Sequence, residues 1–202
     1  MPQKIAILGG TFNPVHNGHL HLACAVHQLY HFDHVLIIPT NLPPHKQSLD
    51  LCSNQDRFHM CQLAFGTLPG FEVSDIEFRI SGKSYTVHTL ERLREKYLDA
   101  EFFLLMGGDM FMTFHRWYRY LDILELAKVI AVARTPGEYE TLKVQQKIHK
   151  EYGGRTEVLD LPVVCVSSTQ IRNDLRKGKA VTHLIPHKVL AYIKENHLFE
   201  GE

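Results

Sequence analysis

The sequence predicts an α/β fold with one mostly parallel sheet flanked by helices. Residues 5–8 form a short apolar run that leads into two glycines, and residues 34–39 form a second apolar run. Between the two runs, Leu22, Val26 and Leu29 recur at the spacing of an amphipathic helix. A strand, a helix and a strand within about forty residues make a βαβ unit, whose right-handed crossover requires parallel strands.

The later segments continue this alternation. Strands are expected in three further apolar runs, at residues 101–106, 128–134 and 158–166. Residues 71–80 alternate only loosely and predict extended segments. Helices are expected at residues 53–64, 87–97, 138–150 and 184–198, and another helix is expected to open at residues 167–169. No internal repeat or break in composition is present, so residues 1–202 are expected to form one domain, with a helical part from about 167 to 202 packed on it.

The composition excludes several classes of protein. Hydrophobic residues make up 45% of the 202 residues, enough for a buried core, so a disordered chain is excluded. The 22 basic and 22 acidic residues balance, which argues against a nucleic-acid partner. No apolar run approaches the roughly 18 residues of a membrane span, and no signal peptide is apparent. Four scattered cysteines without a C-x-x-C pair predict free thiols in the cytoplasm.

A phosphate site is expected at residues 9–19, which read G-G-T-F-N-P-V-H-N-G-H. Glycines let the backbone turn sharply or approach a ligand closely because they carry no Cβ. His16 and His19 lie three apart across the expected helix start, where the side chain of Asn17 can act as the cap. Free N–H groups and the helix dipole favour an anion there, typically a phosphate. The alternative is an ordinary strand–loop–helix corner with exposed histidines.

The fourteen histidines allow another interpretation. His16, His19 and His21 have the residue type of zinc ligands, but no cysteine lies near them, so a zinc site is the weaker hypothesis. Five others are expected on the solvated surface: His27, His31, His34, His149 and His197.

A second anion site is expected near the end of the chain. Ser167, Ser168 and Thr169 open a helix, and Ser167 with Gln170 has the spacing of a capping box. Exposed N–H groups, hydroxyls and Arg172 one turn later can together hold an anion. Ordinary capping with a surface arginine is the alternative.

The middle of the chain offers ligand contacts of another kind. Residues 107–109 read G-G-D directly after an expected strand, so a carboxylate stands at the carboxyl edge of the sheet, where α/β proteins bind ligands. Such a carboxylate commonly accepts hydrogen bonds from ribose, although a helix cap is an alternative role. Trp117 and Tyr118 are either core residues or a wall on which a flat ring can stack. Lys46 can reach a phosphate or is one of many exposed lysines.

These motifs resemble the nucleotidylyltransferase superfamily, through H-N-G-H at residues 16–19 and S-S-T-Q-I-R at residues 167–172. Four segments between these two motifs narrow the resemblance to the bacterial nicotinate-nucleotide adenylyltransferases. These segments are P-x-x-x-P-P-H-K at residues 39–46, S-Y-T at 84–86, G-G-D at 107–109 and W-Y at 117–118. The resemblance covers essentially the whole chain. One position departs from it, since Thr40 stands where an asparagine often follows Pro39.

The resemblance implies a Rossmann-like fold in which ATP and nicotinate mononucleotide meet over the strand ends. The mononucleotide phosphate attacks the α-phosphorus of ATP in line and releases pyrophosphate, with Mg²⁺ held by the phosphates and not by protein side chains. No protein nucleophile is required, so catalysis rests on positioning and on neutralising charge.

The resemblance also implies roles for individual residues. The implied catalytic residues are His16, His19 and Arg172. The implied ATP contacts are Gly9, Gly10, Thr11, Phe12, Gly18, Gly107, Asp109, Ser168 and Thr169. The implied contacts to nicotinate mononucleotide are Lys46, Thr86, Asp109, Trp117, Tyr118 and Arg134. The pyridine ring is expected to stack on Trp117, with its carboxylate on backbone amides near Thr86 and Tyr118.

Two other interpretations stay open. One is a related nucleotidylyltransferase that uses nicotinamide mononucleotide or phosphopantetheine as its acceptor, and the other is a nucleotide-binding module without turnover. The expected partners are the small molecules ATP and nicotinate mononucleotide, with neither a nucleic acid nor a membrane. The oligomeric state is left open, a homodimer being one option.

Overall fold

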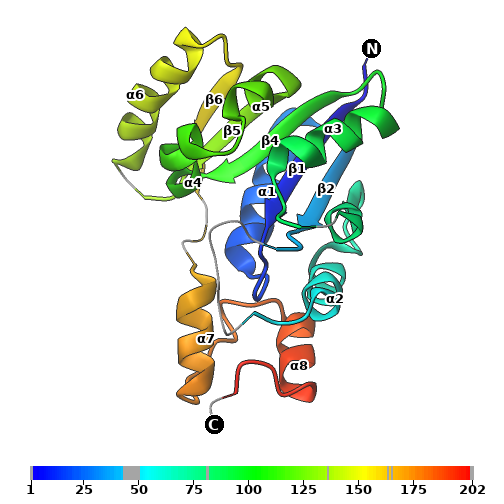
Figure 1. The fold of residues 1–202 in the computed structure, drawn as a ribbon. Helices are drawn as coiled ribbons and strands as arrows, with labels where there is room; N and C mark the ends of the chain where they lie inside the picture. The colour runs from blue at the N-terminus through cyan, green and yellow to red at the C-terminus, as the bar shows by residue number, and fades with distance from the viewer. Residues whose placement is uncertain are drawn as a thin grey trace.

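The computed structural model describes residues 2–42, 51–80, 82–135, 137–162, 164 and 166–200, and a parallel sheet forms the centre of this part of the chain (Figure 1). The six strands are β1 (Lys4–Gly10), β2 (His34–Pro39), β3 (Phe71–Val73), β4 (Glu101–Gly107), β5 (Ala127–Ala133) and β6 (Thr156–Asp160). Their order in the sheet is β3-β2-β1-β4-β5-β6, and each neighbouring pair is parallel. The predicted α/β fold with a parallel sheet is confirmed.

The sequence of the strands follows from burial on both faces of the sheet. In β1, Ile5 and Ile7 join one buried cluster, whereas Ala6 and Leu8 join the other. Successive side chains of a strand point to opposite faces, so a strand covered on both sides reads as a continuous apolar run. The runs at residues 5–8 and 34–39 have this pattern.

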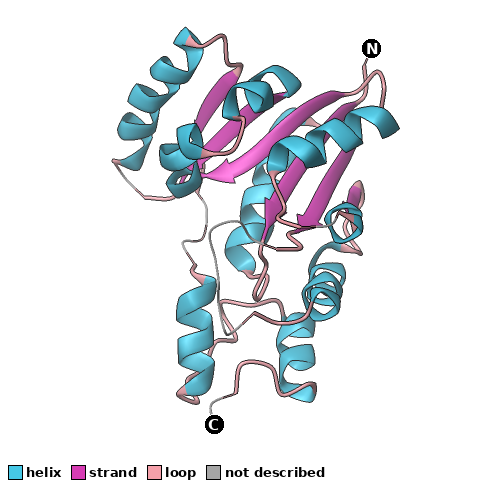
Figure 2. Cartoon of the chain, viewed as in Figure 1, coloured by secondary structure: helices cyan, strands magenta, loops and turns pink. Residues whose placement is uncertain are grey.

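Helices cover both faces of the sheet (Figure 2). On the first face lie α1 (Asn17–Tyr30) and α2 (Asn54–Phe65), and the apolar cluster of this face continues into α7 (Ser168–Arg176) and α8 (His187–Glu195). On the second face lie α3 (Thr86–Lys96), α4 (Gly108–Thr113), α5 (Tyr120–Leu126) and α6 (Glu138–Glu151). Short 3₁₀ turns form η1 (Ile76–Arg79) and η2 (Phe114–Arg116). Within the described ranges, no helix has both the length and the apolar character needed to cross a membrane.

The last two helices lie beyond the carboxyl ends of the strands (Figure 1). Their buried side chains, including Ile171 of α7 and Val189 of α8, belong to the same apolar cluster as the first face of the sheet. The end of the chain is thereby brought to the edge of the sheet where β1 ends.

Several local predictions are wrong. Leu29 is 55% exposed, and Ala23 is buried beside Leu22 and Val26 in its place. Residues 71–80 are extended only in β3 and then form η1. The cap of α1 is His16, because Asn17 is already helical and its Nδ2 donates to the carbonyl oxygen of His183 at 3.0 Å.

Two further predictions, on Ser167 and His149, are wrong. Ser167 is the cap residue of α7, but its side chain makes no capping hydrogen bond. His149, expected on the surface, is 1% exposed and lies against the rings of Phe111 and Phe114 at 5.0 and 5.4 Å. Burial and the nearby His115 lower the pKa of His149, so this histidine is a neutral core residue.

Candidate active site

The candidate site lies where the two central strands separate. The ladder between β1 and β4 ends at Ile7 and Leu104. Beyond these residues, β1 pairs only with β2 as far as Gly10, and β4 pairs only with β5 as far as Gly107. The helices that follow the two strands, α1 and α4, pack on opposite faces of the sheet. This is the topological switch point, where open α/β sheets bind their ligands.

The loop after β1 takes its turn later than the glycines predict. Gly9 and Gly10 belong to the strand, and the left-handed residue is Phe12, with φ of 49° and a buried ring. A Cβ added to Gly9 would meet no atom within 4 Å, whereas one added to Gly10 would lie 3.1 Å from the ring of Phe12. The fold therefore does not require a glycine at position 9, and the space beside it is available to a ligand.

His16 and His19 stack on each other at the start of α1. Their ring centroids are 3.7 Å apart with an interplanar angle of 20°. The backbone N–H of His16 donates to Nδ1 of His19 at 3.2 Å, so a neutral His19 carries its proton on Nε2. The ring of Phe12 packs edge on against the ring of His19, with their centroids 4.9 Å apart. The two imidazoles thus have fixed orientations at a helix N-terminus.

The electrostatic environment keeps His16 neutral. Burial, and next the positive charge of Arg134, lower the pKa of His16 from 6.5 to about 4. At neutral pH this imidazole therefore acts as a polar hydrogen-bonding group and not as a cation.

Close packing explains why a glycine occupies position 18. A Cβ at this position would lie 2.8 Å from the carbonyl oxygen of Val164 and 3.1 Å from the ring of His16. Only glycine lets α1 approach the segment before α7 this closely. The residue predicted to contact ATP thus also joins the first and last parts of the chain.

The second motif meets the first through hydrogen bonds. Ser168 donates from Oγ to the carbonyl oxygen of Pro14 at 3.0 Å, and Arg172 donates from Nη1 to that of Asn13 at 2.8 Å. Arg172 also donates from Nη2 to the hydroxyl of Thr169 at 3.4 Å. The predicted split site is therefore brought together, with the N-terminus of α7 on the loop between β1 and α1.

Asp109 and Arg134 form an ion pair at the ends of β4 and β5. Nη2 of Arg134 lies 3.2 Å from Oδ1 of Asp109, and both side chains are partly exposed. A Cβ on Gly107 would overlap the guanidinium of Arg134, so the glycine makes room for it. The cap residue of α4 is Gly107, so the proposed capping role of Asp109 is wrong.

The aromatic side of the site combines residues from two elements. Tyr118 contacts Tyr85 at a centroid distance of 4.7 Å, which places residues 117–118 beside the start of α3 at Thr86. Trp117 is half-buried and packs edge on against Phe114 at 5.4 Å. Lys46, the remaining predicted contact, lies outside the described residues.

Comparison with known proteins identifies the family. A model of the cytidylyltransferase-like family matches residues 7–174. A relative from Flavobacterium johnsoniae is 39% identical across 98% of this chain and 99% of its own. A relative from Pectobacterium atrosepticum is 37% identical across 99% of this chain and all of its own. Both carry the name "Probable nicotinate-nucleotide adenylyltransferase". The chain belongs to the nicotinate-nucleotide adenylyltransferase family.

A solved structure shares the fold of this adenylyltransferase. The Plasmodium falciparum nicotinic acid mononucleotide adenylyltransferase, complexed with NaAD, superposes with a TM-score of 0.80. The superposition covers 98% of this chain and 97% of that chain at 18% identity. At this identity the likeness concerns the Rossmann-like fold.

Two residues near the site of this adenylyltransferase are missing from the sequence-based set. Glu138 accepts hydrogen bonds from the backbone N–H groups of Arg134 and Thr135 and so fixes the turn after β5. Arg57 is 0% exposed, and its Nη1 donates to the carbonyl oxygen of Thr11 at 2.9 Å. Neither belongs to a motif, and each acts on backbone that only the folded chain brings near.

A cavity in the described part of the chain lies away from the candidate site. Its volume is about 510 Å³, and it lies at the amino-terminal edge of the sheet, opposite the candidate site. It is lined by Glu101, Lys128, Lys143, Gln146, Lys150, Gly154, Arg155, Thr156 and Glu157. Arg155 and Lys128 pair with Glu101 and Glu157 there.

Proposed function

We propose that this adenylyltransferase transfers the adenylyl group of ATP to the phosphate of nicotinate mononucleotide. The products are nicotinic acid adenine dinucleotide and pyrophosphate, as in NAD biosynthesis. The observation that carries the proposal is the pair of hydrogen bonds from Ser168 and Arg172 to the loop after β1. They place the two motifs of an adenylyltransferase at one strand edge, in a chain whose relatives are named for this reaction.

On the ATP side, the proposed contacts are hydrogen-bond donors. His19 donates from Nε2, Arg172 from its guanidinium, Ser168 from its backbone N–H, and Thr169 from its hydroxyl and backbone N–H. Neutral His16 adds a donor that holds no charge of its own. Such donors stabilise the charge that develops on the α-phosphorus, and one of them is commonly worth about 10²–10³ in rate.

The remaining ATP contacts are proposed to act through shape. Gly9 offers backbone beside open space, and Gly10 and Thr11 are proposed to contact ATP through their backbone. Gly18 and Phe12 hold the loop in its turn. Gly107 leaves room at the end of β4 for the guanidinium of Arg134, and it is proposed to contact ATP through its backbone. Asp109 is proposed to accept a hydrogen bond from ribose.

On the acceptor side, we propose that the pyridine ring stacks on Trp117. Its carboxylate would accept hydrogen bonds from backbone N–H groups near Thr86 and Tyr118, which the contact between Tyr85 and Tyr118 brings together. Arg134 and Lys46 are proposed to attract the acceptor phosphate. N–H donors suit a carboxylate better than a carboxamide, because a charged acceptor makes the stronger hydrogen bond.

The chemical step is a single in-line displacement. An oxygen of the acceptor phosphate forms a bond to the α-phosphorus while the bond from that phosphorus to the bridging oxygen of pyrophosphate breaks. The acceptor is already anionic at neutral pH, so no side chain has to remove a proton. The protein therefore contributes alignment and hydrogen bonds.

Mg²⁺ is the proposed cofactor. Within the described ranges, no three His, Cys, Asp or Glu side chains cluster so as to hold a metal ion. A Mg²⁺ ion that enters the site bound to the phosphates of ATP needs no such cluster. The N–H donors described above can bind the phosphates that carry the ion. When bound, Mg²⁺ neutralises phosphate charge.

Several wider properties belong to the same proposal. Residues 1–202 act as one nucleotidylyltransferase domain, and the helical part from about 167 to 202 packs on the rest of this domain. Its partners are the two substrates, with neither nucleic acid nor membrane, and its location is the cytoplasm, in keeping with the free thiols of Cys24, Cys52 and Cys61. A homodimer is tested by measuring the mass of the protein in solution.

The proposed function is tested by supplying purified protein with Mg²⁺, ATP and one acceptor at a time. Nicotinate mononucleotide should give pyrophosphate and an equal amount of the dinucleotide, identified by mass. Preferred use of nicotinamide mononucleotide or phosphopantetheine would assign a different acceptor. Binding of ATP without pyrophosphate release for any acceptor would indicate a module without turnover.

A further inference from the structure

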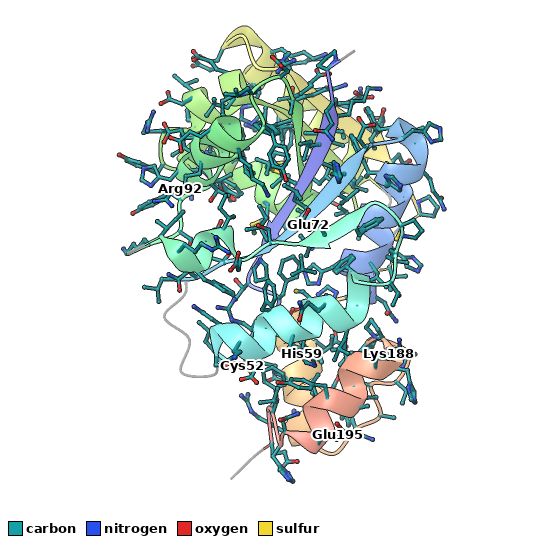
Figure 3. All side chains as sticks on the ribbon, turned by 90° about the vertical axis from the view of Figure 1, so that its right-hand side faces the viewer. Cys52, His59, Glu72, Arg92, Lys188 and Glu195 are labelled. Atoms are coloured by element: carbon teal, nitrogen blue, oxygen red, sulfur yellow. The ribbon has the colours of Figure 1, made fainter. Side chains whose placement is uncertain are left out.

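The strongest unassigned feature is Arg57, a fully buried arginine in α2. This helix lies between the β2 side of the sheet and α8 (Figure 3). It contacts α8 through Asp56, which accepts a hydrogen bond from Tyr192, and through His59, which packs against the Tyr192 ring. The side chain of Arg57 is 0% exposed. A buried guanidinium needs several hydrogen bonds to offset its desolvation, so its partners indicate its purpose.

The guanidinium joins three segments that are distant in sequence. Nη1 donates to the carbonyl oxygen of Thr11 at 2.9 Å, in the loop that leads to His16. Nη2 donates to the carbonyl oxygen of Asn41 at 3.4 Å, after β2, and Nε to that of Cys52 at 3.2 Å, before α2. Three backbone segments around the strand ends are therefore tied to one rigid, planar group.

The Asn41 segment extends this connection to the acceptor side. The backbone N–H of Asn41 donates to Oγ of Ser84 at 3.1 Å, and the N–H of Ser84 donates to the carbonyl oxygen of Leu42 at 3.0 Å. Asn54, one turn before Arg57, donates to the side-chain oxygen of Asn41 at 2.6 Å. Ser84 lies two residues before Thr86, at the start of α3.

Stability alone is a poor explanation for this arrangement. Burial lowers the pKa of Arg57, which means that the site disfavours the charge it contains. A hydrophobic side chain of similar volume commonly serves a core as well as a buried charge does or better. What an apolar side chain cannot do is fix three carbonyl groups at set distances from one another.

We propose that Arg57 is a positioning residue that sets the distance between the phosphate loop, residues 11–16, and the acceptor segment, residues 84–86. Through this distance it holds the acceptor phosphate in line with the α-phosphorus of ATP. The proposal rests on the proposed function for its effect on turnover, but its effect on the loop itself exists without substrate.

The chain contains a matched control. Arg94 also binds two backbone carbonyl oxygens, of Ala100 at 2.6 Å and of Leu126 at 3.3 Å. These groups precede β4 and β5, so they lie at the opposite edge of the sheet from the site. Arg57→Lys and Arg94→Lys therefore both remove a guanidinium that binds several backbone carbonyl oxygens. The first substitution does so at the site, and the second does so far from it.

The first test compares kcat and the two KM values of these variants at a temperature where each is folded. Arg57→Lys should lower kcat about 100-fold with smaller changes in either KM, since a misplacement near 1 Å can cost this much. Arg94→Lys should keep kcat while it lowers Tm. Unchanged kcat in Arg57→Lys, or equal losses in both variants, would overturn the proposal.

A second test needs no substrate. The backbone N–H of Thr40 donates to the carbonyl oxygen of Gly10 at 2.9 Å, and that of Cys52 donates to Oδ1 of Asn13 at 3.1 Å. Both amides should exchange with deuterium faster in Arg57→Lys and at the wild-type rate in Arg94→Lys. Wild-type exchange rates at both amides in Arg57→Lys would refute the positioning role. If wild-type protein fails to adenylylate nicotinate mononucleotide, the proposed function fails while this result still decides the role of Arg57.

A milder variant covers the case in which Arg57→Lys does not fold. Asn54→Ala keeps the charge of Arg57 but removes one partner of Nη2 and the bond to Asn41. It should lower kcat by a smaller factor, again with little change in KM. A loss confined to Tm would contradict the proposal.

Discussion

Arg172 in α7 donates from Nη1 to the backbone carbonyl oxygen of Asn13 at 2.8 Å, across 159 positions of sequence. The hydrogen bond from Ser168 to Pro14 is a second contact between α7 and the loop after β1. A side chain that binds a carbonyl in this way is held in place before any ligand arrives. The start of α7 and the start of α1 can therefore form one anion site, although they come from opposite ends of the chain.

Arg172→Lys should impair turnover strongly. The guanidinium can hold the carbonyl oxygen of Asn13 with one nitrogen and direct others to a phosphate, whereas an ammonium is a single point of charge. We expect kcat/KM for ATP to fall about 100-fold by steady-state kinetics. Arg176→Lys, an exposed position on the same helix, serves as the control and should keep wild-type kinetics. Similar effects of both substitutions would rule out a specific role of Arg172.

His19→Ala should affect turnover far more than binding. If Nε2 donates mainly to the charge of the transition state, kcat falls about 10²–10³-fold while the Kd for ATP changes little. Single-turnover kinetics and calorimetry measure the two quantities. His21→Ala removes an exposed imidazole two residues later and should change neither. Equal losses of kcat and affinity in His19→Ala would argue for ground-state binding alone.

His16 should make the folded state sensitive to acid. Its pKa is about 4 when folded and 6.5 in the reference state, so between these values the unfolded chain binds more protons. Stability is therefore greatest above pH 6.5 and falls as the pH decreases toward 4, by up to about 3 kcal/mol for this group. Buried His149 acts in the same direction, since its pKa is also lowered.

Urea unfolding of His16→Phe between pH 4 and 7 measures this contribution. The variant keeps a ring against His19 but has no proton to bind, so its stability should depend on pH less steeply than that of the wild-type protein. His21→Phe, at an exposed position, should keep the wild-type slope. An unchanged slope in His16→Phe would show that His16 is not held neutral by the fold.

Gly9→Ala and Gly18→Ala should separate ligand contact from packing. A Cβ at position 9 meets no protein atom within 4 Å, so Tm should be kept while ATP affinity falls about tenfold through a clash with the ligand. A Cβ at position 18 lies 2.8 Å from the backbone oxygen of Val164, so Gly18→Ala should cost about 1–3 kcal/mol of stability. Wild-type ATP affinity in Gly9→Ala would remove Gly9 from the site.

The predictable part of the fold is the part that local sequence controls. Buried parallel strands need continuous apolar runs, so residues 5–8 and 34–39 were recognisable as strands. The two halves of the site could be paired because both carry family motifs. The second half does not directly follow its strand, since β6 ends at Asp160, whereas the sequence predicts a strand that continues to residue 166. Strand order, and the separation of β1 from β4 after Ile7, depend on long-range packing that no short segment encodes.

The missed residues show where sequence patterns end. Arg57 reads as an ordinary polar position in a helix, because its partners are backbone carbonyl groups of Thr11, Asn41 and Cys52, and every residue has such a group. His149 reads as a surface residue, because only the packing of α6 against α4 buries it. In both cases the deciding contact is with a segment distant in sequence, and no sequence motif marks it.

The most direct test of the proposed reaction is the ratio of kcat/KM for nicotinate mononucleotide to that for nicotinamide mononucleotide, with Mg²⁺ and saturating ATP. The backbone N–H donors proposed near Thr86 and Tyr118 would favour a carboxylate, so the ratio should be at least roughly tenfold in favour of the nicotinate form. A ratio near one, or a preference for the nicotinamide form, would contradict the proposed acceptor.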